Sequence, residues 1–479
     1  MVRVLTVLAF ANCVCSFALG CSSSSGDAVA GSGGNASAGG TSGQGGTSGN
    51  AGSTTPVDCT FTQTSATSAK IPTVGIVTWS TTLANPQSAH IDFGLSTSYG
   101  MTAPVDLAMQ SYRTLLLGMK ASRTYHYRIV ASNGSGQCTS SDYTIATGAL
   151  ANGLPTVSVA TKNASALYGG FLITGQFLAG AGKSGSPAYI LDADGDIVWA
   201  YSPGNDVAAG AMTYDGTAMW TNSNNVPSGT AHVHRVTMDG LTDQDLSSQF
   251  IGQNHQLTVL PDESVAFYAY GSNSCEDIKL RLTDGTVKTV VNAQAAHGGS
   301  GACHVNDIQY SPDDDTLVFS DLDNQDITKV TRTGSTVWVL NGTGNTFSGA
   351  SWKGGQHGFH ILGVDDLVLF NNNSRNVAGA SVSIGGTSDG SIVIEMKLNL
   401  SAKTATQSWL YKANPGVQND IMGDVQRLPN GNTIVAYSTQ GVLHEVDANG
   451  ALLQELTWPL SSTFGYIEKR ATLYGPRPR

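Results

Sequence analysis

The chain has 479 residues, of which 40% are hydrophobic and 12% are charged. Its 24 Lys and Arg residues against 35 Asp and Glu residues give a formal charge of −11 at pH 7. This acidic balance argues against nucleic acid and anionic lipid headgroups as partners, because both are negatively charged.

The N-terminus has the pattern of a lipoprotein signal peptide over residues 1–20. Arg3 is followed by a mostly apolar stretch, residues 4–14, and small and apolar residues lead to Cys21. The stretch is too short to span a bilayer as a helix. We expect a lipidated Cys21 followed by a Gly/Ser-rich linker up to residue 56. Because Ser22 rather than Asp follows Cys21, the sorting rules of Gram-negative bacteria predict a lipid anchor in the outer membrane, facing the periplasm or the cell surface.

Four cysteines remain beyond the signal peptide and Cys21. An even number in an exported protein indicates two disulfides. The domain boundaries favour Cys59–Cys138 and Cys275–Cys303, although four cysteines allow three pairings.

Residues 57–148 contain short alternating runs separated by turn residues, such as "VGIVTWS" and "TYHYRIVA". This pattern predicts a β-sandwich. The stretch from Leu117 to Ile129 resembles the corner of a fibronectin type III domain, with Trp79 as a core residue. Such domains are usually spacers or binding modules, so we expect structural roles for His90 and His126.

A recurring unit occupies residues 150–479, in which two apolar alternating runs flank a tight turn. There are six copies, about fifty residues apart, and all but the fifth have a turn glycine, at Gly195, Gly240, Gly285, Gly334 and Gly450. Glycine adopts a positive φ at little cost in conformational energy, so these turns predict β-hairpins. Six such repeats are typical of a six-bladed β-propeller. A stack of separate sandwiches would need linkers, and none divides this region. The sequence therefore predicts an all-β protein.

Three histidines recur at equivalent places in these repeats. The runs "NHQLTVLPDE", "CHVNDIQYSPDD" and "QHGFHILGVDD" put His255, His304 and His357 at the start of an early strand. In a propeller the first strand of each blade lines the axis, so three imidazoles should meet in one funnel. Asn306 lies two residues after His304, so its side chain should lie on the same face of the strand, and we expect it beside the three histidines. His360 lies three residues after His357, so its side chain should lie on the opposite face of the strand, and we expect it to face the neighbouring sheet.

Other polar residues have weaker claims to function. His232, His234 and His297 are second-tier candidates for the same funnel. The acidic run of residues 313–315 is most simply a solvated turn with side chains bonded to its own backbone.

In order and spacing, the stretches around His255, "HVNDIQYSPDDDTLVFS", "GGQHGFHIL" and "VQRLPNGNTIV" resemble the bacterial arylsulfate sulfotransferases. The resemblance covers nearly all of residues 150–479. It implies a six-bladed propeller that moves a sulfuryl group from a phenyl sulfate to a phenol through a sulfohistidine. By position His357 corresponds to the nucleophile, and His255, His304 and Asn306 to groups that bind the sulfuryl oxygens and assist the leaving phenolate. No cofactor is required.

One position departs from the family pattern. The family has an arginine downstream of its second histidine, and this chain has Leu322 there. Loss of one such donor typically costs about 10²–10³ in rate. Candidate replacements are Lys353, Arg375, Arg427 and Arg470.

Two other functions fit the same histidines. Three convergent imidazoles also suit zinc or copper, as in hydrolytic metal sites. A propeller without the arginine could instead bind an aromatic or anionic ligand with no reaction.

Overall fold

The computed structural model describes residues 55–176, 187–204, 207, 209–223, 232–271, 274–298, 302–377, 380–383 and 390–476. The predicted signal peptide, the lipidated Cys21 and most of the Gly/Ser-rich linker lie outside these ranges. None of the described helices is long and apolar enough to span a membrane.

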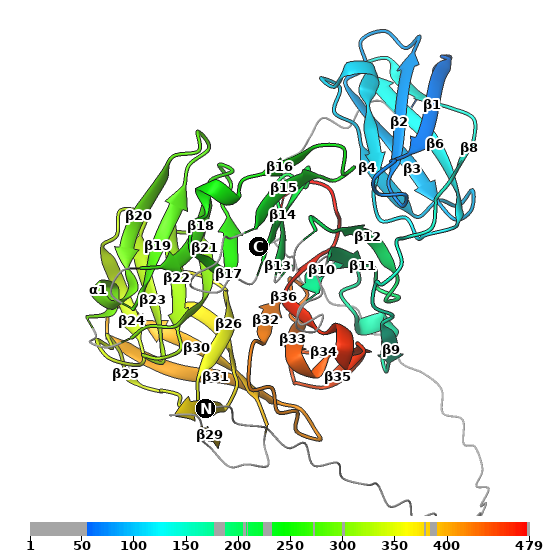
Figure 1. The fold of residues 1–479 in the computed structure, drawn as a ribbon. Helices are drawn as coiled ribbons and strands as arrows, with labels where there is room; N and C mark the ends of the chain where they lie inside the picture. The colour runs from blue at the N-terminus through cyan, green and yellow to red at the C-terminus, as the bar shows by residue number, and fades with distance from the viewer. Residues whose placement is uncertain are drawn as a thin grey trace, which may run out of the picture. The chain divides into compact units, whose positions relative to one another are not determined.

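Two antiparallel sheets between residues 61 and 146, blue to cyan in Figure 1, form the predicted β-sandwich. The first sheet contains β1 (Phe61–Thr67), β2 (Gly75–Thr81) and β5 (Thr114–Leu116). The second contains β4 (Met101–Pro104), β3 (Ser88–Gly94), β6 (Thr124–Asn133), β7 (Gly136–Thr139) and β8 (Tyr143–Ala146). Alternate residues of these strands face each other and form a core that includes Trp79, Phe93 and Tyr127. The Cys59–Cys138 disulfide is present beside this core.

Six further sheets in the described part of the chain form the blades of a propeller. Blade one contains β36 (Phe464–Arg470), β10 (Phe171–Gln176), β11 (Ala188–Leu191) and β12 (Ile197–Tyr201). Blade two contains β13 (Ala209–Met212), β14 (Ala218–Asn222), β15 (Val233–Thr237) and β16 (Asp243–Asp245). Blade three contains β17 (Gln253–Val259), β18 (Val265–Tyr270), β19 (Glu276–Arg281) and β20 (Val287–Asn292), and α1 (Ala293–His297) follows it.

The other three blades follow in chain order. Blade four contains β21 (Val305–Ser311), β22 (Thr316–Asp321), β23 (Asp326–Thr331) and β24 (Thr336–Leu340). Blade five contains β26 (Gln356–Ile361), β27 (Asp366–Asn371), β30 (Ile392–Asn399), β31 (Thr404–Lys412) and the short β25 (Ser348–Gly349). A hairpin of β28 (Ser374–Val377) and β29 (Ala380–Ser383) is inserted in it. Blade six contains β32 (Asp424–Arg427), β33 (Thr433–Tyr437), β34 (Val442–Val446), β35 (Leu452–Thr457) and β9 (Ser158–Thr161).

The predicted tight turns join the third and fourth strands of each blade, counted from the axis. Gly195, Gly240, Gly285, Gly334 and Gly450 all have positive φ, as a hairpin turn of this kind requires. The first strands are β13, β17, β21, β26, β32 and β36, and each contacts the next around a closed ring. The strands that carry the predicted histidines therefore line the axis, as the repeats predict.

Both ends of the propeller sequence close this ring (Figure 1). The C-terminal strand β36 pairs with β10 as the innermost strand of blade one, and β9 pairs with β35 as the outermost strand of blade six. Across the same junction, the Lys469 ammonium of β36 lies 2.9 Å from a carboxylate oxygen of Glu445 in β34, and both side chains are buried. Hydrogen bonds and a buried ion pair thus hold the last blade to the first.

We expect Glu445→Gln to weaken this closure. The change leaves the Lys469 ammonium buried without its counter-charge, which typically costs about 3–5 kcal/mol of unfolding free energy. Urea unfolding measures the loss. The control is Lys397→Met, which removes a more exposed pair with Asp366 and should change the unfolding free energy much less, because solvent screens that pair. Equal losses in the two variants would contradict a closing role for the buried pair.

Candidate active site

The three predicted histidines lie at the starts of first strands in blades three, four and five. His255 is the third residue of β17, His304 immediately precedes β21, and His357 is the second residue of β26. The ring centroids of His255 and His304 are 6.2 Å apart. His304 and His357 interact electrostatically, and so do His255 and His357. The structure therefore brings all three imidazoles together at one mouth of the propeller axis.

His357 is held by a side-chain amide. Its Nδ1 lies 2.6 Å from Oδ1 of Asn372, and the Asn372 amide nitrogen donates to the carbonyl oxygens of Asn419 and Met422 at 2.6 and 2.9 Å. Because the amide nitrogen faces two carbonyls, Oδ1 must accept, so His357 carries its proton on Nδ1. Burial lowers the pKa of His357 to about 4. At neutral pH the ring is therefore uncharged, with its lone pair on Nε2.

His255 is surrounded by aromatic rings. Tyr466 of β36 stacks on it with a centroid distance of 6.5 Å and an interplanar angle of 17°, and Tyr268 meets it edge-on at 6.1 Å. Burial, together with the charges of His304 and His357, lowers the pKa of His255 to about 3. Protonation of His255 is therefore unfavourable at neutral pH.

His304 is fixed through its backbone. Its N–H donates to Oδ1 of Asp321 at 3.0 Å, and its carbonyl accepts from the N–H of Leu322 at 2.9 Å. The neighbouring residue forms the predicted Cys275–Cys303 disulfide. These links anchor the chain where it enters β21.

Asn306 is fully buried between blades four and five. Its amide nitrogen donates to the carbonyl oxygen of Gln356 at 2.7 Å, and its Oδ1 accepts from the Ser320 hydroxyl at 2.5 Å. The same hydroxyl lies 3.2 Å from the carbonyl oxygen of His357. The Asn306 side chain is thus engaged with the strand that carries His357.

The candidate replacements for the missing arginine lie in different places. Arg427 pairs with Glu395 at the far end of its strand. Arg470 is buried, bonding to Glu468 and to two backbone carbonyls. Arg375 belongs to β28, and Lys353 is exposed in the loop before β26, four residues from His357. Arg427 and Arg470 thus bond to groups away from the histidines, whereas Lys353 lies in the loop that leads to the strand of His357.

Several of the remaining histidines have carboxylate partners. His234 lies 2.8 Å from Asp243, His126 lies 2.7 Å from Asp142, and His90 lies 3.4 Å from Asp92. His232 lies just before β15, and its backbone N–H donates to the Ser223 hydroxyl. His297 contacts Asp321 at 3.2 Å, and so shares the carboxylate that holds the His304 backbone.

Two groups of described residues have ligand atoms within 4.8 Å of one another, as a metal site requires, and the three axial histidines form neither. The first is His297, Cys303 and Asp321, but Cys303 is in a disulfide. The second is Asp192, Asp194 and Asp196, whose carboxylates contact the Lys120 ammonium at 2.6–3.2 Å. These distances do not favour the metal hypothesis for the axial histidines.

Sequence reasoning missed three groups that shape the site: Asn372, Tyr268 and Tyr466. Asn372 stands in a run of three asparagines directly after β27, and a polar run after a buried strand was the available signal. Tyr466 lies in the last strand, which nothing local connects to blade three.

Several solved structures resemble the chain at low sequence identity. A protein of unknown function from Bacteroides caccae is 15% identical with a TM-score of 0.41, covering 62% of this chain and 98% of its own. TolB from Acinetobacter baumannii is 13% identical with a TM-score of 0.42, covering 74% and 81%. The calcium-binding protein regucalcin from Agrobacterium tumefaciens is 13% identical with a TM-score of 0.35, covering 64% and 94%.

A search of curated protein sequences found no significant match. A family model does match part of the chain. Over residues 282–463, which include His304, Asn306 and His357, the chain is similar to the arylsulfotransferase (ASST) family.

Proposed function

We propose that this protein is an arylsulfate sulfotransferase that works by a ping-pong mechanism, with His357 alternately free and sulfated. The observation that carries the proposal is the Asn372 contact, which leaves a neutral His357 with its lone pair on Nε2 beside two further imidazoles. A neutral imidazole is a competent nucleophile near pH 7. The ASST match over residues 282–463 supports the same chemistry.

The reaction has two balanced halves. In the first, Nε2 of His357 forms a bond to sulfur, the bond from sulfur to the aryl oxygen breaks, and the leaving phenolate takes a proton. In the second, the oxygen of an acceptor phenol attacks the same sulfur and the N–S bond breaks. The acceptor phenol releases its proton in this half, and free His357 is restored.

His255 and His304 are proposed to act on the sulfuryl oxygens and on the phenolic oxygen. Fixed N–H donors at those oxygens stabilise the charge that develops in the transition state. A bound anion also favours the protonated form of a nearby imidazole, so the arrival of a sulfate ester should raise the pKa of His255 from its low value. The low pKa keeps His255 uncharged before the substrate binds, and the negative charge of the substrate then favours protonation of this ring.

Asn306 is proposed to position the nucleophile rather than to contact the substrate. Its amide holds the Gln356 carbonyl, one residue before His357, and shares Ser320 with the His357 carbonyl. This role replaces the oxyanion contact that the family resemblance implies.

A second candidate function rests on Leu322. This residue is half-buried next to His304, where the family has an arginine, so the described site lacks that cationic donor. A propeller that binds an aromatic or anionic ligand without transferring a sulfuryl group fits the same observation. We also propose that lipid on Cys21 anchors the protein in the cell envelope.

We expect His357→Ala to abolish turnover of 4-nitrophenyl sulfate because the nucleophile is lost. Brief incubation of the unmodified protein should add about 80 Da, one SO₃ group, to the peptide that contains His357. Intact-mass and peptide analysis under alkaline conditions, together with nitrophenol release, measures both effects. His126→Ala in the sandwich is the control. Unchanged turnover by His357→Ala would end the proposal.

The pH profile tests the hydrogen bond to Asn372. With a His357 pKa of about 4, kcat/KM should stay level between about pH 7 and pH 5 and fall only as the ring is protonated. Asn372→Ala should lower kcat about 10- to 100-fold across that plateau by freeing the ring. The matched control is Asn373→Ala, since Asn373 bonds to the Gly390 carbonyl. A fall in rate centred near the ordinary histidine pKa would contradict this assignment.

Leu322→Arg tests how much the absence of an arginine at this position lowers the rate of the reaction. If the site is a sulfotransferase weakened by a missing cation, the substitution should raise kcat/KM for 4-nitrophenyl sulfate by about 10². Leu322→Met keeps the size and adds no charge, so it should leave the rate unchanged. Steady-state nitrophenol release measures both variants. Equal rates in all three proteins would show that a cation at this position is not what limits the reaction.

A further inference from the structure

Asp321 is a fully buried carboxylate beside the candidate active site. It is the last residue of β22, and its Oδ1 accepts the backbone N–H of His304 at 3.0 Å. The same oxygen also accepts the N–H groups of Asp323 at 3.0 Å and Asn324 at 3.3 Å. The other oxygen, Oδ2, lies 3.2 Å from Nε2 of His297. The carboxylate therefore has hydrogen-bond donors on both oxygens, and one of them belongs to a histidine of the site.

The backbone of Asp321 is bonded to the strand of a second histidine. Its carbonyl oxygen accepts from Nε2 of Gln356 at 2.8 Å, and the same nitrogen donates to the carbonyl oxygen of Asp326 at 2.8 Å. Gln356 is fully buried and directly precedes His357. One residue thus bonds to the backbone of His304 and to the neighbour of His357. The spacing of these two histidines depends on where Asp321 lies.

His297 supplies a counter-charge to this carboxylate. It is the last residue of α1, and its side chain is buried. Burial alone would lower the pKa of His297, but the hydrogen bond to Asp321 and the carboxylate of Asp326 raise it above the ordinary histidine value. A protonated imidazole favours the ionised form of Asp321, and an ionised carboxylate is the stronger acceptor for a backbone N–H. The pair therefore strengthens the bond to His304.

Two other links hold the chain on either side of His304. The Cys275–Cys303 disulfide precedes it, and Oε2 of Glu276 accepts the N–H of the residue that follows it, at 3.2 Å. The bond to Asp321 is made by the N–H of His304 itself. Without this bond the flanking residues stay held, but the peptide group that enters His304 can turn and carry the imidazole with it.

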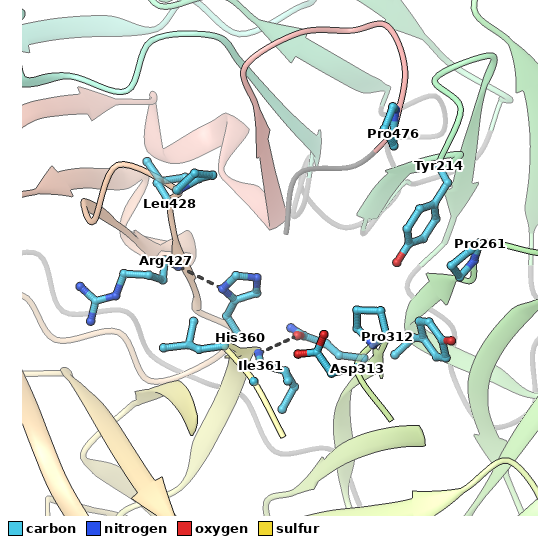
Figure 2. A pocket seen from close by; sticks show the side chains of 14 residues that line it. Tyr214, Pro261, Pro312, Asp313, His360, Ile361, Arg427, Leu428 and Pro476 are labelled. Atoms are coloured by element: carbon cyan, nitrogen blue, oxygen red, sulfur yellow. Dashed lines mark hydrogen bonds between the residues drawn. The ribbon is translucent and has the colours of Figure 1, made fainter. Parts of the chain in front are cut away.

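The opposite ends of the same first strands are linked without Asp321. At the opposite mouth of the propeller, Oε1 of Gln309 in β21 accepts the N–H of Ile361 at 3.2 Å (Figure 2). There too, Nδ1 of His360 accepts the N–H of Arg427 in β32 at 3.2 Å, and these residues line a cavity of about 450 Å³. β21 has seven residues and so spans roughly 20 Å between the two mouths. Loss of the Asp321 carboxylate should therefore loosen the histidine end alone.

We propose that Asp321, paired with His297, is a positioning residue for sulfuryl transfer, which fixes the imidazole of His304 beside His357. This inference rests on the proposed function, in which His304 acts on the sulfuryl and phenolic oxygens. Donors stabilise a transition state when they are already in place, and a displacement of about 1 Å can cost about 10²-fold in rate. Because Asp321 is fully buried, it acts through His304 and not on the substrate.

Asp321→Ala tests the inference in the full chain with 4-nitrophenyl sulfate. The variant keeps the carbonyl that binds Gln356 and removes the acceptor of the His304 N–H. We expect kcat to fall about 10- to 100-fold and KM to change less than about threefold, because a misplaced donor acts on the transition state. Asp321→Asn keeps an oxygen that can accept this N–H, so it should recover most of the lost rate. An Asn variant as slow as the Ala variant would contradict the role of the acceptor.

A double-mutant cycle shows whether Asp321 acts through His304. In the His304→Ala background, Asp321→Ala should lower kcat by less than about twofold, because no ring remains to be misplaced. Gln309→Ala is the matched control, since it removes a link between the same two strands at the opposite mouth, and it should leave kcat unchanged. Multiplying effects in the cycle, or an equal loss in Gln309→Ala, would overturn the inference.

A spectroscopic measurement separates this inference from the proposed function. If the unmodified protein releases no nitrophenol, the proposed function fails, but the position of His304 can still be followed by NMR of protein with isotope-labelled histidine. The ring signal of His304, assigned by its loss in His304→Ala, should shift in Asp321→Ala and stay in place in Gln309→Ala. An unshifted signal in Asp321→Ala would refute the positioning role whether or not the protein is active.

Discussion

Closure of the ring by β36 is the constraint on which the rest of this propeller depends. The strand pairs with β10, contacts the first strands on either side of the axis, and places Lys469 against Glu445 of the last blade. It also supplies Tyr466, which stacks on His255 and donates to the Asn306 carbonyl. One strand therefore completes the fold and one wall of the candidate active site together.

The histidine mouth and the opposite mouth of the propeller differ in the charged groups that surround them. His357 is buried and His255 is half-buried beside it, and removal of these two rings from water lowers both pKa values, so both rings are uncharged at neutral pH. The turns at the opposite mouth have carboxylates instead, and several of them pair with lysine or arginine side chains.

Much of the fold could be predicted from sequence because its signals are local and repeated. Turn glycines such as Gly195 mark the outer hairpins, and a shared offset places His255, His304 and His357 on first strands. The closing strands could not be predicted in this way, since β36 pairs with residues nearly three hundred positions earlier and no local pattern records that contact. The hydrogen bonds of the Asn306 side chain to Gln356 and Ser320 could not be predicted from alternation along the strand, because the register of β21 shifts between Val305 and Asp307. Asn372 was missed because its link to His357 depends on how two strands pair.

The position of β36 after the histidine strands also has a consequence for biogenesis. A polypeptide is synthesised from its N-terminus, so His255, His304 and His357 are all made before Tyr466 and Lys469. Until the last strand arrives, blade one lacks its innermost member and His255 lacks the ring that stacks on it. The candidate site is therefore incomplete until β36 has been made, and a product that terminates before this strand has the three histidines without Tyr466.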